Sequence, residues 1–334
     1  MNTFWMRFKS HKRGLWALRL LIVMIGITFT VEFWSNDKPL LIVCDTGVFF
    51  PILRYYPETY FMKGEDLEMD YLTSEFNIFV KKHRAWVIWP PYRHSPYRLS
   101  ESNHPVPSAP CALHVLGTDE QGRDLLARLV YGTRICLTFG LCVAVFGTIL
   151  GIFIGAIQGY WGGKFDLYTQ RLVEIWSGLP VLFMLMIIAN FLTPSLEFLA
   201  IVMALFNWRP VSAAIRAEFL KARGLPYVLS AKVLGATDFR MMWRHILPNA
   251  MATGIAQFPF LVNSGIASLA SLDFLGVGLK AGTPSLGELL QQAKSNLHAP
   301  WLGIYPLCML AIILILVTLT GEGLRDALDP GRTS

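Results

Sequence analysis

Charged residues are scarce in this sequence. Lys, Arg, Asp and Glu make up 16% of its 334 residues, while 54% of the residues are hydrophobic. About a quarter of the residues in an ordinary soluble domain are charged, so this chain has too little charge for a water-soluble exterior. Its composition therefore excludes an ordinary soluble protein and favours a membrane protein whose apolar segments face lipid and one another.

Other absences exclude further classes of protein. The sequence has no phosphate loop of the form GxxxxGK[ST], so we expect no ATP hydrolysis by this chain and no cofactor of its own. The five cysteines show no CxxC or Cys/His spacing. The formal net charge of +6 is not collected in one basic stripe, which argues against nucleic-acid binding. Four histidines are spaced too widely for a typical metal site, so no metal is expected at His83, His94, His104 and His114.

Six apolar runs are predicted to cross a bilayer as helices, which makes the expected fold an all-α polytopic membrane protein. No small-x-small cleavage site follows the first run, so we interpret it as a retained span rather than a signal peptide. The six expected spans are residues 15–34, 135–160, 173–192, 196–214, 250–272 and 301–319.

Basic residues predict the orientation of these spans. Residues 1–14 carry four basic residues and no acidic residue, and residues 210–250 carry six basic residues against two acidic ones. Loops rich in Lys and Arg are retained on the cytoplasmic side of a membrane. Both termini, including the tail at residues 321–334, are therefore expected on the cytoplasmic side of the membrane.

An insert at residues 35–115 separates the first expected span from a core at residues 116–320. The insert has eight basic residues against nine acidic ones, so it shows no cytoplasmic bias and is expected in the periplasm. Its aromatic residues and prolines favour a small folded subdomain with short strands. In an oxidising compartment Cys44 and Cys111 could be joined or could stay as thiols, and the sequence leaves both alternatives open.

Glycine and proline predict how two of the spans pack and bend. In the second expected span, Gly147, Gly151, Gly155 and Gly159 are spaced four apart, so they form one stripe on a helix. Such a stripe lets the backbone of a neighbouring helix approach closely. Pro180 in the third expected span is predicted to break or kink that helix, because proline has no amide N–H and clashes with the preceding turn.

Residues 216–249 form a connection that is too apolar for a solvated linker. A helix is predicted to begin at Pro226 and to end at Gly235, which can adopt a left-handed cap. Thr237 or Asp238 is predicted to cap a second short helix. The expected product is a helix–glycine–helix elbow that ends at a Pro248-Asn249 stop and has an apolar face of Leu229, Val233 and Leu234. Such a face needs a partner groove, and lying on the membrane surface is the alternative.

This elbow resembles the loop by which the permeases of bacterial ABC importers dock on their ATPase. In the peptide-transporting branch the loop reads Tyr-Val-x-Ala-Ala, then Gly, and finally His-Ile-Leu-Pro-Asn; this sequence departs from the pattern at Pro226 and Ser230. The resemblance implies that ATP and Mg bind to the partner ATPase. It assigns the docking contact to Tyr227, Val228, Ser230, Ala231, Gly235, Ala236, His245, Leu247 and Pro248.

Residues 116–135, LGTDEQGRDLLARLVYGTRI, resemble the segment that leads into the second span of dipeptide, oligopeptide and nickel permeases. From the residues themselves, Thr118 or Asp119 is predicted to cap a helix, and Asp124 and Arg128 are spaced to pair across one turn. Arg123 is a candidate contact for lipid head groups or for a gate. The resemblance implies either a gate role or a scaffold role for Gly117, Thr118, Asp119, Gly122, Arg123 and Asp124.

Further stretches are similar to the second permease subunit of Yej-type peptide importers, among them NDKPLL, SLDFLGVGL and APWLG. The resemblance implies ATP-driven import of oligopeptides by alternating access, and it extends the expected substrates to peptide antibiotics of the microcin C kind. The implied partners are a second, different permease subunit, an ATP-binding subunit, a periplasmic peptide-binding protein and the lipid bilayer.

Asp273, near the outer end of the fifth expected span, is either a contact for the amino terminus of a peptide or a carboxylate in water at the interface.

Three other functions of the chain also stay open. A nickel or opine permease of the same family would differ in the ligand of its binding protein. A polytopic membrane enzyme would need paired ionisable residues on adjacent spans, which the first, second and sixth spans almost lack. A self-sufficient channel would have no use for a docking elbow.

Overall fold

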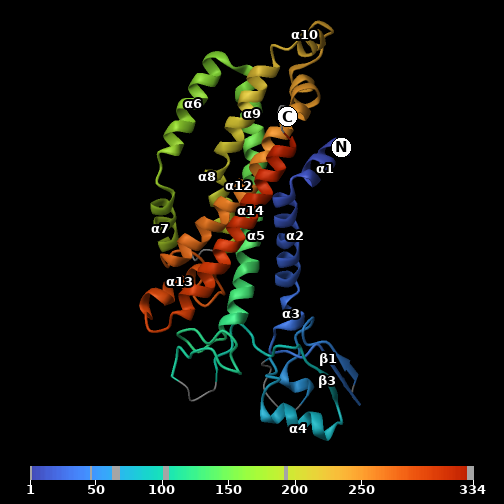
Figure 1. Ribbon diagram of the computed structural model, residues 1–334, viewed down its shortest axis with the longest axis vertical. Coiled ribbons are helices and arrows are strands. Elements are labelled where there is room, and N and C mark those ends of the chain that lie inside the picture. The colour runs from blue at the N-terminus through green and yellow to red at the C-terminus, as the bar shows by residue number, and fades with distance from the viewer. Residues whose placement is uncertain (1, 46, 62–67, 101–104, 192–194, 329–334) are drawn as a thin grey trace. The chain divides into compact units, whose positions relative to one another are not determined.

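The structure is a computed structural model that describes residues 2–45, 47–61, 68–100, 105–191 and 195–328 (Figure 1). His104 and the end of the expected tail at 321–334 lie outside the described residues. The chain divides into two compact units. We name them the helical unit, Met1–Val23 with Ile135–Ala281 and Cys308–Ser334, and the mixed unit, Met24–Arg134 with Gly282–Leu307.

Helices make up the helical unit, and three of the chain's helices begin or end in the mixed unit. A π-helical segment, Met241–Ile246, joins two of these helices without a break. The helices are α1 (Asn2–Ser10), α2 (Lys12–Phe29), α5 (Leu125–Trp161), α6 (Gly163–Ser177), α7 (Val181–Phe191), α8 (Leu196–Asn207), α9 (Arg209–Ala222), α10 (Pro226–Val233), α11 (Asp238–Arg240), α12 (Leu247–Phe274) and α14 (Trp301–Leu328).

Four helical stretches among the described residues are long and apolar enough to cross a membrane. A fifth span results if α6 and α7 count as one bent pair. The first expected span is not among them, because α2 contains three basic residues, Lys12 and Arg13 at its start and Arg19 within its apolar run. The four stretches are Leu125–Trp161, Leu196–Ala222, Asp238–Phe274 and Trp301–Leu328.

The expected break in the third span lies between α6 and α7. α6 ends at Ser177, α7 begins at Val181, and the two helices are bent by 64°. Pro180 lies in the gap, where its ring would clash with a continuing helix, so the span predicted at 173–192 is not one straight helix. Lys164 and Arg171, which follow the second expected span at residues 135–160, lie in a helix, α6. The reason is local, because Gly162 turns the chain with a φ of 60° and the helix begins at the next residue.

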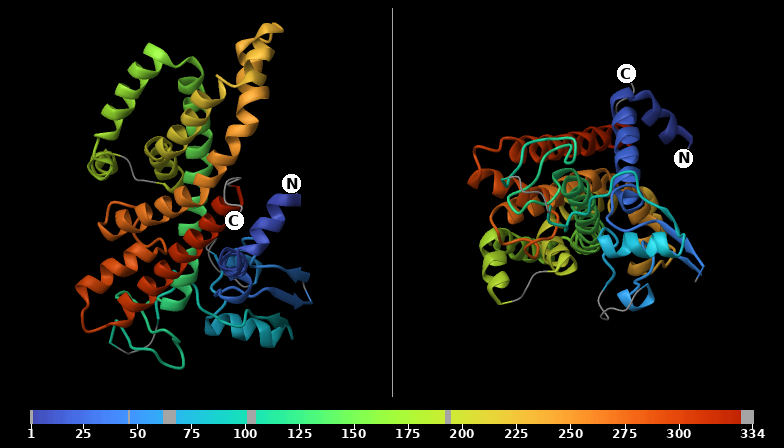
Figure 2. Two further views of the ribbon diagram at one scale, coloured as in Figure 1. Left: turned by 45° about the horizontal axis from the view of Figure 1, so that its top comes forward. Right: turned by 90° about the horizontal axis from the view of Figure 1, so that it is seen from below.

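The glycine stripe of α5 lies against α9, and α9 also packs along α12 (Figures 1 and 2). A methyl group added at Gly151 would lie 2.6 Å from the carbonyl oxygen of Trp208 and 2.6 Å from Cβ of Val211. One added at Gly159 would lie 2.5 Å from Cβ of Phe219. These distances are too short for any side chain, so glycine is what allows the two backbones to approach.

Replacing Gly151 by Ala should destabilise the helical unit, because the new methyl group meets backbone atoms that cannot yield without moving α9. Overpacking of this kind typically costs about 1–3 kcal/mol. Gly26 is the matched control, since it also lies in an apolar helix but a methyl group there has no neighbour within 4 Å. Thermal unfolding in detergent should show a lower midpoint for Gly151→Ala than for Gly26→Ala, and equal midpoints would contradict the close packing.

The mixed unit contains a three-stranded antiparallel sheet, which agrees with the short strands expected in the insert. The strand order is β2-β1-β3, and Ile42 in the central strand pairs with Phe49 on one side and with Val87 on the other. The elements of the unit are α3 (Val31–Trp34), β1 (Leu41–Cys44), β2 (Gly47–Phe49), a 3₁₀ turn (Glu58–Tyr60), α4 (Ser74–Lys82), β3 (Trp86–Ile88) and α13 (Leu286–Ser295).

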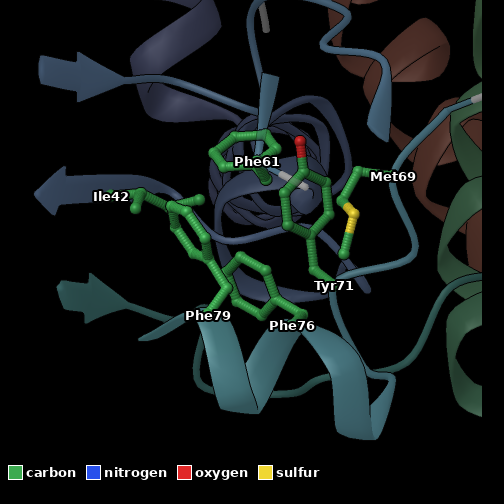
Figure 3. Packing of buried hydrophobic residues seen from close by; sticks show 6 residues of the cluster. All are labelled: Ile42, Phe61, Met69, Tyr71, Phe76 and Phe79. Atoms are coloured by element: carbon green, nitrogen blue, oxygen red, sulfur yellow. The ribbon is translucent and has the colours of Figure 1, made fainter. Parts of the chain in front are cut away.

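An aromatic core joins this sheet to α4 (Figure 3). Phe76 and Phe79 lie one turn apart on α4, so both rings face the sheet, and the side chain of Thr73 caps the helix by accepting the amide of Phe76 at 3.3 Å. The rings of Phe61 and Phe79 meet edge to face with centroids 5.3 Å apart. The buried members of the core are Ile42, Phe61, Met69, Tyr71, Phe76 and Phe79.

Cys44 and Cys111 are not joined by a disulfide in the structure; both are thiols. Each thiol instead contacts its own local turn. Sγ of Cys44 lies 3.6 Å from the carbonyl oxygen of Gly47 at the β1–β2 turn, and Sγ of Cys111 accepts the amide of His114 at 3.4 Å. All five cysteines, each among the described residues, are thiols.

Candidate functional site

The elbow begins with a helix whose end is built as expected. α10 runs from Pro226 to Val233, and Gly235 follows with a φ of 84°. The amide of Gly235 donates to the carbonyl of Lys232 at 3.0 Å, and the amide of Ala236 donates to the carbonyl of Ala231 at 3.1 Å. These are the two hydrogen bonds of a Schellman cap, which needs a left-handed residue and therefore favours glycine.

The second arm of the elbow continues into a membrane-spanning helix. Thr237 caps it by accepting the amide of Arg240 at 3.4 Å, so of the two expected caps Thr237 is the one used. The expected stop at Pro248-Asn249 is wrong, because α12 runs through both residues. A π turn precedes them, in which the amide of Leu247 bonds to the carbonyl of Met242, and Pro248 occupies the first turn of α12, where a missing amide is tolerated.

Buried side chains and polar contacts hold the two arms at a fixed angle. Val228 of α10 and Met241 and Ile246 of the π segment are each at most 3% exposed. The hydroxyl of Tyr160, at the end of α5, donates to Oδ1 of Asp238 at 2.5 Å. The two arms of the elbow therefore share a packed inner side, and one hydrogen bond ties the second arm to α5.

The outer surface of the elbow is apolar and exposed. Leu229 is 50% exposed, Phe239 72%, Leu234 86% and Val233 88%. We call these four residues the elbow tip. Three exposed basic residues are close to them in the sequence, namely Lys232, Arg240 and Arg244. Contiguous apolar residues with a polar rim mark a site for a partner.

The docking residues assigned from the sequence divide into two groups. Val228 and Leu247 are buried, so they hold the elbow together and do not face a partner. Tyr227, Ser230 and Pro248 are exposed, and Ala231, Ala236 and His245 are half-buried beside them. Phe239 is exposed beside these residues in the chain but was not among the expected docking residues, because its only signal in the sequence is a large aromatic residue between Asp238 and Arg240.

A buried ion network lies in the segment that precedes α5. Oδ2 of Asp119 accepts a hydrogen bond from Nε of Arg123 at 2.6 Å. The same oxygen lies 3.3 Å from Nε of Arg128. The carboxylate of Glu288 in α13 accepts two hydrogen bonds, one from Nη2 of Arg128 at 2.6 Å and one from Nη2 of Arg123 at 3.3 Å. Asp119 and Arg128 are fully buried and Arg123 is nearly so, so the two charges of each sign balance one another away from water. The network fastens α13 to the start of α5.

The turn around Asp119 needs its two glycines. Gly117 and Gly122 have φ values of 87° and 82°, and a methyl group at Gly117 would lie 2.6 Å from the carbonyl oxygen of Ser108. Thr118 is buried, and its hydroxyl accepts the amide of Ser108 at 2.8 Å. These residues form a scaffold within the mixed unit.

Two expectations for this segment are wrong. The cap of α5 is Asp124, whose Oδ1 accepts the amide of Ala127 at 2.8 Å, and neither Thr118 nor Asp119 has that role. Asp124 does not pair with Arg128, because its other oxygen accepts the hydroxyl of Tyr92 at 2.5 Å. Burial, with the Asp124 carboxylate beside it, raises the pKa of Tyr92, so the hydroxyl keeps its proton and remains a donor. Arg123 is too buried to reach lipid head groups.

Asp273 lies at the end of α12 and is 5% exposed, so it is not a carboxylate in open water. Its Oδ1 accepts the amide of Leu279 at 2.7 Å, and this bond shapes the turn after α12. Gly278 lies against the carboxylate, and any larger residue there would overlap it. In this structure Asp273 therefore has a local structural contact.

Long apolar helices define an integral membrane protein, and its elbow has an exposed apolar surface. The family described as binding-protein-dependent transport system inner membrane component matches residues 147–334. That match covers more than half of the chain, and the chain belongs to this family of ABC transporter permeases. It is accordingly a membrane component of a transport system and not an enzyme, and ATP hydrolysis belongs to a separate subunit.

Two relatives match nearly the whole chain, and a third matches about two thirds of it. It is 42% identical to the inner membrane ABC transporter permease protein YejE of Escherichia coli, over 98% of this chain and 96% of that one. It is 40% identical to the peptidoglycan transport system permease protein YejE of Agrobacterium fabrum, over 98% and 92%. The dipeptide transport system permease protein DppC of Haemophilus influenzae is 37% identical over 65% of this chain and 74% of its own length. The resemblance to Yej-type permeases is therefore confirmed.

Proposed function

We propose that this chain is a channel-forming permease of an ATP-driven importer that carries oligopeptides from the periplasm to the cytoplasm. The observation that carries the proposal is the elbow tip, whose four apolar residues are exposed while the inner side of the same elbow is buried. A surface of this kind fits a groove on an ATP-binding subunit. The other partners are a second, different permease and a periplasmic peptide-binding protein.

The proposed mechanism is alternating access. ATP binding closes the ATPase dimer and moves the elbow, and α12 moves with it because no loop lies between them. The spans then open toward the periplasm, peptide enters from the binding protein, and hydrolysis resets the gate. In this topology both termini and the elbow are cytoplasmic, and the insert is periplasmic.

Peptide chemistry is the substrate class favoured over nickel or opines. The names of two relatives refer to peptidoglycan and dipeptide transport, and both substrates contain amide-linked amino acids. Peptide antibiotics of the microcin C kind would enter by the same route. Asp273 stays a proposed contact for the amino terminus of a peptide, which would have to displace the amide of Leu279.

Reconstitution of the complete importer in proteoliposomes tests this function. With the binding protein, both permeases and the ATPase present, labelled oligopeptide should accumulate only when ATP is supplied, and ATP hydrolysis should rise on addition of peptide. Nickel and opines should cause neither effect, whereas a peptide–nucleotide antibiotic should compete with oligopeptide. Uptake without ATP, or a purified complex without an ATPase, would contradict the proposal.

A further inference from the structure

Three potential metal ligands meet in the mixed unit, although they are far apart in the sequence. His94 follows β3, His114 lies before α5, and Asp124 caps α5. One ligand atom from each lies within 4.8 Å of the other two. Nδ1 of His114 is 2.8 Å from Oδ2 of Asp124, and the rings of His94 and His114 have centroids 4.9 Å apart.

The three groups are withdrawn from water to different degrees. His114 is 4% exposed, Asp124 1%, and His94 is half-buried. A carboxylate at this depth requires compensation by positive charge or hydrogen bonds. Two imidazoles beside one carboxylate are a donor set that suits zinc and other first-row transition ions, whereas calcium and magnesium require mostly oxygen ligands.

Neighbouring side chains hold these ligands in place. The hydroxyl of Tyr92 donates to Asp124 Oδ2 at 2.5 Å, and Nε2 of His114 lies 3.2 Å from Oγ of Ser100. Hydrogen bonds with such outer partners fix the orientation of ligands around a metal. The cluster therefore has the supporting contacts that a metal centre requires.

A cavity of about 220 Å³ opens onto the cluster and has His94, His114, Asp124 and Ser100 among its lining residues. It provides an entry path and room for a water molecule as an additional ligand. Two arginines also line it, but each has another partner. Arg98 donates to Asp70 at 2.7 Å, and Arg93 lies over the ring of Trp89 at 4.9 Å.

We propose that His94, His114 and Asp124 bind one divalent transition-metal ion, preferably zinc, with water at the open position. Tetrahedral zinc would place neighbouring ligand atoms roughly 3.4 Å apart, given bonds of about 2.0–2.2 Å. The side chains would turn slightly from their present positions, in which His114 Nδ1 and Asp124 Oδ2 are 2.8 Å apart and all three ligand atoms lie within 4.8 Å of one another. The ion would join the segment after β3 to the start of α5, and Tyr92 would act as a positioning residue for Asp124.

Calorimetric titration of the full-length chain in detergent tests this site. The protein would be stripped with a chelator, carry no polyhistidine tag and be titrated with zinc chloride. One zinc ion should bind per chain, and calcium chloride should give no binding. His94→Ala and His114→Ala should each weaken zinc binding at least about 100-fold, and Tyr92→Phe about 10-fold. His298→Ala is the matched control, since His298 is exposed and lies outside the cluster. The zinc affinity of this variant should equal that of the original chain.

A second readout uses cobalt, whose visible absorption bands report ligand geometry. Intense bands of a tetrahedral site should appear in the wild-type chain and be lost in His94→Ala. Absence of zinc binding by the folded wild-type chain would overturn the proposal, and the cluster would then be a hydrogen-bond network alone. Unchanged affinity in His94→Ala would overturn it as well. If His114→Ala fails to fold, His94→Ala decides, because His94 is only half-buried at the cavity wall.

Discussion

Replacing Leu234 by Asp at the elbow tip is expected to separate this permease from its ATPase. Leu234 is 86% exposed, so the folded chain should tolerate the change within about 0.5 kcal/mol. In the docked complex the same position would be covered, and a buried central contact of this kind contributes about 2 kcal/mol or more. Docking should therefore weaken at least about 30-fold. Co-purification of the ATPase, and peptide-stimulated ATP hydrolysis, would both be lost.

Leu297→Asp is the matched control for this experiment. Leu297 is also 86% exposed but lies in the mixed unit, before α14. The control chain should retain the ATPase on purification. If Leu234→Asp retains it equally well, the elbow tip does not dock, and if both variants lose it, the effect comes from charge or folding in general.

Asp119→Ala is expected to cause the largest loss of stability in the mixed unit. The change leaves the guanidinium groups of Arg123 and Arg128 buried with Glu288 as their one remaining carboxylate in the network. It also removes an acceptor for two backbone amides. The amides of Gln121 and Arg123 donate to Oδ1 of Asp119 at 2.9 and 2.8 Å. Breaking a buried ion pair by removing one partner costs about 3–5 kcal/mol. Denaturant unfolding of the purified chain should show this loss.

Glu120 provides the comparison for Asp119. It is the next residue and also acidic, but it is exposed, and its carboxylate contacts the side-chain amide of Asn296 at 3.1 Å. Glu120→Ala should stay within about 0.5 kcal/mol of the original chain. Equal stability of the two variants would mean that the Asp119 network is not the anchor between α13 and α5.

Local signals were enough to predict the first arm of the elbow. Pro226 can begin a helix, Gly235 can adopt a left-handed cap and Thr237 can accept an amide, and each effect involves residues within one turn of one another. The continuation through Pro248 could not be predicted in this way. It depends on a π turn whose buried residues, such as Met241 and Ile246, are fixed by tertiary packing.

Long-range partners explain the errors in the segment before α5. Spacing suggested that Arg128 pairs with Asp124, four residues away, yet its carboxylate partner in α13 lies 160 residues further along the chain. Asp124 in turn bonds Tyr92, which lies 32 residues before it. Sequence spacing shows what a single helix can bring together, and it contains no information about contacts that folding creates.

The same limit applies to the histidines and to the spans. His94 and His114 are 20 positions apart, which led us to expect no metal, but the fold brings their rings together. The helical spans were easier to predict, since apolar length is a property of the local sequence. Three basic residues in α2 nevertheless leave that helix outside the set of clear spans.

Helical continuity between the elbow and α12 has a mechanical consequence. Asp238–Phe274 is one helical stretch of 37 residues, which is about 55 Å long at about 1.5 Å per residue. A bilayer core is about 30 Å thick, so this rod is roughly 25 Å longer than the hydrocarbon, and in the proposed mechanism its excess length next to the elbow would act as a lever arm. A lateral displacement of about 4 Å at the end of that arm would tilt the rod by about 10°. In the proposed mechanism, small strokes of the ATPase would thereby be converted into torque on a helix inside the membrane.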